Sequence, residues 1–289
     1  MKKYSTQDLW IRIILFFAIC VILIFSFQGF VLPIVRTLFN NGESFPETLE
    51  TNLVRAMNGI VGIGLVYIFL QFDRKSMSET GLSWNKEFGW EWILLSIPIT
   101  IAGFIPTIIL EYTFGIATIE GLPIIDIGFP MIDIVGILLS LIIAFFAFGV
   151  GEELLFRGYI QKIIETKYPF IYAAVVSAAL FGLLHLLLLA PGGQLADMFA
   201  ILISAFMMGL TFSYVFKTTK YNLILPIAIH GFWDFFYFAF QAETTYEDFS
   251  QMILGVVASI VGAGVIFVLV HIYTTKRFAV AMAEDYSSE

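Results

Sequence analysis

Eight runs of apolar residues, each near the length that a helix needs to cross a bilayer, constrain this chain more than any other feature. The composition agrees, because 59% of the 289 residues are hydrophobic and only 13% are charged. The polar stretches between the runs have only the length of loops. We therefore expect an all-α polytopic membrane protein, folded as one membrane domain over residues 1–289. Its helices are predicted at about 10–33, 53–72, 89–113, 132–156, 170–190, 197–216, 221–240 and 250–273.

The basic residues predict how these helices are oriented, since Lys and Arg are retained in short cytoplasmic loops. Eight crossings place both termini on the same side of the membrane. With the N-terminus in the cytosol, 13 of the 15 basic residues lie on the inner side and only Arg36 and Arg55 lie outside. The outer loops are acidic instead, which accounts for much of the net charge of −8. We expect an N-in, C-in topology, the lipid bilayer as a partner, and no nucleic-acid partner.

Two acids and a base, Glu152, Glu153 and Arg157, interrupt the fourth apolar run. A charge at mid-bilayer costs about 2.5 to 3.5 kcal/mol, so such residues usually face protein or a water-filled cavity and have a function. On a helix, residues four apart share a face, so Glu153 can pair with Arg157. Glu152 then has no partner on its own helix and suits a general base or acid. The alternative is that the motif only ends a helix at the cytosolic interface, with solvated charges.

Histidines lie in two further apolar runs. His185 shares a helix face with Phe181, and a lone buried histidine is usually just hydrogen-bonded. His230 and Asp234 are also four residues apart, which is harder to explain by packing alone. They could form half of a metal site, an orienting pair for a catalytic imidazole, or a set of donors for an oxyanion.

The order of these motifs resembles that of the CAAX prenyl endopeptidase and bacteriocin-processing family of intramembrane proteases, known as CPBP or Abi. The motifs are Glu-Glu-x-x-x-Arg, Phe-x-x-x-His and His-x-x-x-Asp, and the similar catalytic core covers about residues 130–240. The resemblance implies that Glu152 activates the attacking water and that His185 assists it. It further implies an oxyanion site and a site-organising pair, formed respectively by His230 with Asp234 and by Glu153 with Arg157.

One position departs from the family pattern, because many members carry Asn where this chain has Asp234. An amide donates a hydrogen bond, whereas an ionised carboxylate cannot. Asp234 would therefore be protonated, hold His230 in one tautomer, or ligate a metal. Family members have been described both as metalloproteases and as metal-free glutamate proteases. Glu152, His185, His230 and Asp234 would make a plausible zinc set with one position open for water.

We therefore expect an intramembrane endopeptidase in a bacterial plasma membrane, with a cavity that opens toward the cytosol. Its substrates would be prenylated CAAX-type proteins, other membrane-associated or lipidated peptides, or bacteriocin-like peptides. An ion-coupled transporter or channel, with the buried charges as a relay, is the first rival, and a non-enzymatic immunity or scaffold protein is the second. A shared site requires convergence, so a separation above about 10 Å between Glu152 and both histidines would refute it.

Overall fold

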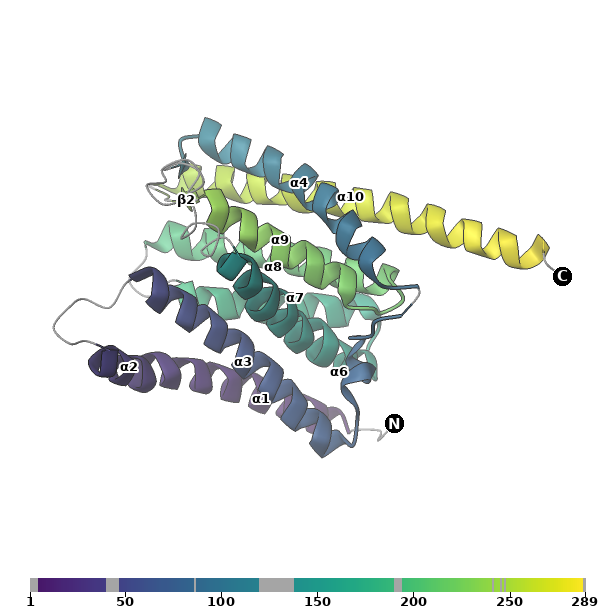
Figure 1. Cartoon of the computed structure of the whole chain (residues 1–289), viewed down its shortest axis with the longest axis horizontal. Helices are drawn as coiled ribbons and strands as arrows, with labels where there is room; N and C mark the ends of the chain where they lie inside the picture. The colour runs from purple at the N-terminus through teal and green to yellow at the C-terminus, as the bar shows by residue number, and fades with distance from the viewer. Residues whose placement is uncertain are drawn as a thin grey trace.

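The computed structural model describes residues 5–39, 47–85, 87–119, 138–189, 194–240, 242–244, 246 and 248–287. The chain is a helical bundle, as expected, and Figure 1 shows its elements in order. The N-terminal half contains α1 (Thr6–Ser26), the π-helix η1 (Phe27–Val31), α2 (Leu32–Phe39), α3 (Glu47–Asp73), the 3₁₀-helix η2 (Met77–Thr80), α4 (Trp90–Thr113) and β1 (Ala117–Ile119). After a short α-helix at 138–143 come the π-helices η3 (Ala144–Glu152) and η4 (Leu154–Gln161), α6 (Lys162–Glu165), α7 (Phe170–Leu189), α8 (Leu195–Thr218), α9 (Ile224–Phe240), β2 (Ala242–Thr244) and α10 (Phe249–Ser287).

Seven helices of the described chain are long and apolar enough to cross a bilayer, so the protein is a polytopic membrane protein. The eighth predicted span, 221–240, is α9, which has only 17 residues. At 1.5 Å per residue α9 is about 25 Å long, somewhat short of a typical hydrocarbon core. Its first eight residues are all buried. This helix therefore lies inside the bundle, against α4, α8 and η3, rather than facing lipid.

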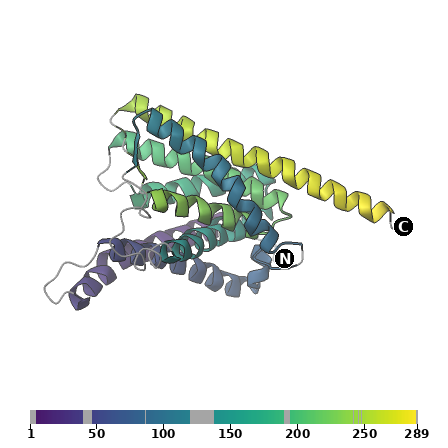
Figure 2. The ribbon, with the colours of Figure 1, turned by 45° about the horizontal axis from the view of Figure 1, so that its top comes forward.

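Both ends of the described chain lie on the same side of the bundle (Figure 1), as an even number of traverses requires. We call this side the terminal face. Its loops are joined by hydrogen bonds, for example from Lys167 Nζ to Thr6 Oγ1 and from the Leu223 amide to the Gly81 carbonyl. The opposite side, the distal face, holds the end of α4 and the starts of α8 and α10 (Figure 2). Which face meets the cytosol stays a prediction.

The distal face carries the two strands of the described chain. β1 and β2 pair antiparallel over three residues, with Ala117 opposite Thr244 and Ile119 opposite Ala242. Nearby, the backbone amide of Tyr246 donates to Asp197 Oδ1 at 3.2 Å. These contacts join the segment after α4 and the start of α8 to the connection between α9 and α10.

Small residues bring α3 very close to the π-helical segment. A side chain added at Gly59 would meet the backbone of Ala147, and one added at Gly151 would come within 2.8 Å of the Gly59 Cα atom. Such contacts are typical of membrane helices, whose backbones approach through small residues. They hold the segment that carries the acidic motif against its neighbours.

The fourth membrane helix does not end at the acidic motif. It was expected to end near residue 156, but the continuous helical segment Leu138–Glu165 goes on for nine more residues. Every residue from Glu153 to Gln161 is buried. The alternative that the motif is a solvated helix end is therefore wrong, and Glu152 lies in the middle of the helix.

Candidate active site

Three side chains from three helices meet at the centre of the bundle. The Oε2 atom of Glu152 in η3 lies 3.9 Å from His185 Nε2 in α7 and 3.8 Å from His230 Nε2 in α9. Both distances are far below the 10 Å limit set for a shared site. The same Oε2 atom is buried and accepts no hydrogen bond.

The histidine tautomers follow from the partners of the other ring nitrogens. His185 Nδ1 lies 3.0 Å from the carbonyl oxygen of Phe181, which can only accept, so Nδ1 carries the proton. His230 Nδ1 lies 2.8 Å from Glu153 Oε1 and donates to that carboxylate. Both Nε2 atoms are therefore turned toward Glu152.

Asp234 lies on the exposed side of this group. Its Oδ2 atom is 3.4 Å from His230 Nε2, one helical turn away, and 23% of its side chain is exposed. The sequence left open whether Asp234 holds the His230 tautomer. In the structure that function belongs to Glu153, which occupies Nδ1, and Asp234 shares the Nε2 side with Glu152.

Glu153 and Arg157 form the ion pair expected from their spacing, with Nη1 donating to Oε1 at 3.0 Å and both side chains fully buried. The second guanidinium nitrogen, Nη2, donates to the Gly209 carbonyl of α8 at 2.9 Å. Because Glu153 Oε1 also accepts from His230, one carboxylate oxygen joins three helices: η4 through Arg157, α9 through His230, and α8 through the guanidinium.

The π-helical winding explains how two adjacent glutamates reach the same imidazole. In an α-helix neighbouring side chains point about 100° apart. In η3 and η4 the backbone bonds run from i to i+5, so each turn contains more residues and neighbours diverge less. Glu152 can thus lie near Nε2 of His230 while Glu153 binds Nδ1. π-helical turns are frequently found at functional sites.

Aromatic rings pack against both imidazoles and limit their rotation. Phe212 of α8 stacks on His230 with ring centroids 4.7 Å apart and planes 22° apart, and Phe181 packs against His185 at 4.4 Å. The Arg157 guanidinium lies over the same two rings, at 4.7 Å from Phe181 and 5.3 Å from Phe212. The Phe-x-x-x-His motif pointed to Phe181 in the sequence. Phe212 and Gly209 could not be recognised as site residues, because they lie in a helix that is apolar along its whole length.

A cavity of about 270 Å³ adjoins the site and reaches toward the distal face. Three of the predicted site residues line it, together with residues from α4, α7, α8, α9, α10 and the segment before α10. The lining residues are Glu111, Phe181, His185, Asp197, Ala200, Ile201, Ser204, Ala205, Met208, His230, Trp233, Asp234, Tyr237, Tyr246 and Ser259.

A family model described as type II CAAX prenyl endopeptidase Rce1-like matches residues 134–236. This segment is similar to the CAAX protease family. The family resemblance inferred from the three motifs is thereby confirmed, and the matched segment contains all six predicted site residues. No curated protein gives a significant match to the chain.

The donor atoms of the site show whether its side chains, as placed, fit a metal ion. Both histidines bind a carbonyl or a carboxylate through Nδ1, as metal-ligating histidines usually do. However, among the described residues no group of three or more His, Cys, Asp and Glu has its atoms placed to hold an ion. As they stand, the described side chains do not fit a zinc ion.

Proposed function

We propose that the protein is an intramembrane endopeptidase in which Glu152 activates a water molecule for attack on a peptide bond. One observation supports this most: the partnerless Oε2 atom of Glu152 faces the Nε2 atoms of two histidines at 3.8 and 3.9 Å. A water held there would donate one proton to the carboxylate and the other to His185 Nε2, which is free to accept. Its lone pair would then point away from the three side chains, toward the cavity.

In the first step Glu152 takes a proton from the water as the new C–O bond forms at the peptide carbonyl carbon. The carbonyl oxygen becomes an oxyanion, which needs a hydrogen-bond donor. His230 supplies one from Nε2 when it carries both protons, with Glu153 accepting from Nδ1. Asp234, when protonated, supplies a second donor on the same side.

In the second step the C–N bond breaks and the proton on Glu152 moves to the leaving amine. The carboxylate is thereby restored, so the same residue acts as base and then as acid. Glu153 and Arg157 touch no reacting atom in this scheme. They hold His230 in one tautomer and one orientation.

The substrates would be membrane-associated peptides: prenylated CAAX-type proteins, other lipidated proteins, or bacteriocin-like peptides. Such segments reach a site within the bundle without leaving the bilayer. The match to the family model supports a protease and does not specify the peptide sequence that is cleaved.

Cleavage of a panel of these peptides by the purified protein tests the proposal, with and without a zinc chelator. Glu152→Gln keeps the shape of the side chain but removes the base, and should lower kcat by about 10²- to 10⁴-fold. Glu87→Gln, in the exposed ion pair with Lys220 on the terminal face, is the matched control and should leave kcat unchanged.

Each outcome has a distinct meaning. Loss of cleavage in Glu152→Gln alone supports the glutamate base, and loss on chelation in the wild type supports a metalloprotease instead. If the folded wild type cleaves nothing, the proposal fails. Ion flux in proteoliposomes that depends on Glu152 would then favour the transporter, and peptide binding that survives Glu152→Ala would favour an immunity or scaffold protein.

A further inference from the structure

Glu111 of α4 is a buried acid of the cavity that the proposed reaction does not use. It is 2% exposed and lines the cavity together with Tyr237 of α9. The Tyr237 hydroxyl donates to this carboxylate and lies 3.3 Å from each of its two oxygens. Phe104 packs edge-on against the tyrosine ring at 5.1 Å, which holds the hydroxyl in place. Tyr237 follows His230 and Asp234 at i+7 on one helix face, so the pair continues the site along α9.

The two other acids that line the cavity have partners that account for them. Asp197 accepts from the backbone amides of Gln194 and Tyr246, at 3.1 and 3.2 Å, and thereby caps the start of α8. Asp234 lies 3.4 Å from His230 Nε2 and belongs to the candidate active site. Neither acid needs a further group to explain its position.

Glu111 has no comparable partner. Among the described residues that line the cavity there is no Lys or Arg. The Tyr237 hydroxyl has one proton to donate, whereas an ionised carboxylate can accept about four hydrogen bonds. Glu111 is also the third residue from the end of α4, where the helix dipole favours a cation over an acid. Acids buried in a membrane domain are costly and usually have a function.

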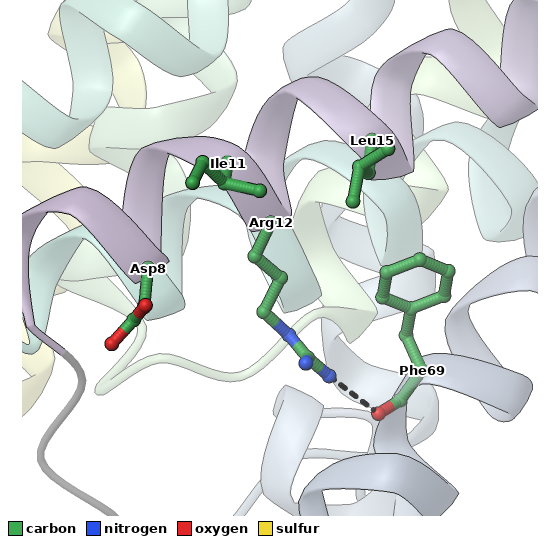
Figure 3. Close-up of a pocket in the computed structure, with 5 residues that line it drawn as sticks. All are labelled: Asp8, Ile11, Arg12, Leu15 and Phe69. Carbon is green, nitrogen blue, oxygen red and sulfur yellow. Dashed lines mark hydrogen bonds between the residues drawn. The ribbon is translucent and has the colours of Figure 1, made fainter.

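Two other buried acids of the described chain, Asp73 and Glu153, each have a guanidinium partner. Asp73 pairs with Arg12 at 2.7 Å beside the hollow between α1 and α3 that Figure 3 shows. There the same guanidinium also donates to the Phe69 carbonyl at 3.1 Å, so its charge is satisfied within the protein. Glu111 departs from this pattern, because no described residue supplies its counter-charge.

A second polar group of the cavity also lacks a partner. The Ser204 hydroxyl of α8 lines the cavity, is buried, and makes no hydrogen bond within the described part of the chain. Buried hydroxyl groups without a partner are uncommon in proteins. This one indicates that the cavity accommodates a molecule with hydrogen-bonding groups, as a peptide has.

From these contacts we infer that Glu111, positioned by Tyr237, recognises a cationic side chain, Lys or Arg, of the peptide in the cavity. We call this pair the Glu111 subsite. The inference rests on the proposed protease function and specifies its substrate. An ammonium or guanidinium group would supply both the donors and the charge that Glu111 lacks. Prenylated CAAX-type proteins, other lipidated proteins and bacteriocin-like peptides all remain substrates, and those with a basic residue at this position are preferred.

Helix geometry limits how far the basic residue lies from the scissile bond. His230 and Tyr237 are seven residues apart on α9, so about 10 Å separates them along the helix axis at 1.5 Å per residue. An extended peptide advances about 3.3 Å per residue. A peptide that lies along this face therefore places the basic residue within about three residues of the bond that is cleaved.

Cleavage of matched peptides tests the inference. N-acetylated peptides of one sequence carry either Lys or its uncharged isostere norleucine at successive positions on both sides of the scissile bond, and acetylation removes the terminal amine as a competing cation. At one position the wild type should cleave the Lys peptide with a kcat/KM about 10- to 100-fold above that for norleucine. Glu111→Gln should lower this ratio to about 1. Asp197→Asn is the matched control, because it removes an acid from the same cavity and should keep the ratio.

Three results would overturn the inference. They are a wild-type ratio of about 1 at every position, an unchanged ratio in Glu111→Gln, and an equal loss in Asp197→Asn, which would assign the preference to the overall charge of the cavity. If Glu111→Gln does not fold, Tyr237→Phe replaces it. This variant should lower the ratio by about 2- to 10-fold, because it removes the hydrogen bond that positions Glu111, and an unchanged ratio would again refute the subsite.

Binding separates this inference from the protease proposal. The affinity of the same peptides for Glu152→Gln, measured by fluorescence anisotropy without turnover, should show the same preference for Lys. Lys-selective binding without any cleavage by the wild type would keep the Glu111 subsite and refute the protease. Cleavage by the wild type with no preference for Lys would refute the subsite and keep the protease.

Discussion

The buried Glu153–Arg157 pair makes a quantitative prediction about stability. Removing one partner of a fully buried pair costs about 3–5 kcal/mol, because the other charge is left without compensation. Arg157→Met should cost this amount, since Glu153 then keeps only the hydrogen bond from His230. Glu153→Gln should cost a similar amount, because its amide oxygen can keep both hydrogen bonds but no longer balances the guanidinium charge.

The double variant Glu153→Gln/Arg157→Met should be far less destabilised than the sum of the two single variants. No buried charge of the pair remains, and the Gly209 carbonyl that loses Arg157 still accepts from Ser213 Oγ at 2.9 Å. We expect a coupling free energy of about 3 kcal/mol or more between the two sites.

Thermal unfolding in one detergent measures this cycle. Each single variant should lower Tm by roughly 6 to 20 °C, taking about 2–4 °C per kcal/mol for a protein of this size class. The exposed pair of Glu87 and Lys220 is the control, and Glu87→Gln should change stability by about 1 kcal/mol or less. Additivity of the two single variants within about 0.5 kcal/mol would refute the reasoning, because it would mean that the two charges do not compensate each other.

Three further changes separate packing from chemistry. Gly59→Ala should cost about 1–3 kcal/mol in a thermal unfolding assay, because the added methyl group meets the backbone of η3; Gly64→Ala on the same helix meets nothing and should be neutral or stabilising by up to about 1 kcal/mol. Asp234→Asn should keep kcat within about tenfold of the wild type, whereas Asp234→Ala should lose about 10²- to 10³-fold if this residue donates to the oxyanion; equal kcat for the Asn and Ala variants contradicts that role. Phe212→Leu removes the ring stacked on His230 and should lower kcat by about 2- to 10-fold, with KM less affected; a change in KM alone would mean that the ring contacts substrate.

Much of the fold could be predicted because membrane helices follow from composition and length alone. Seven of the eight expected spans are long apolar helices, and the i, i+4 pairing of Glu153 with Arg157 is present. The end of the fourth helix was misplaced because a hydropathy pattern treats charge as a helix end. In the structure these charges stay buried, since Arg157 and His230 compensate Glu153 from within the bundle.

The features of the site that the sequence did not predict are those that depend on tertiary contacts. The link from Glu153 to His230 joins residues 77 apart, and no local pattern specifies it. Phe212 and Gly209 contribute a ring face and a carbonyl, which any apolar helix could offer. The π-helical winding has no recognisable sequence signature here, and without it the two glutamates would not be expected to approach one imidazole together.

That winding makes the site sensitive to chain length as well as to side chains. Losing one residue within η3 would let the backbone return to i to i+4 bonds, so the helix and its apolar surface would survive. Glu152 and Glu153 would nevertheless rotate with respect to the histidines of α7 and α9. A deletion of one residue should thus convert the proposed protease into a stable membrane protein that binds peptides without cleaving them. Relatives that differ here in length by one residue should be tested for binding before they are tested for proteolysis.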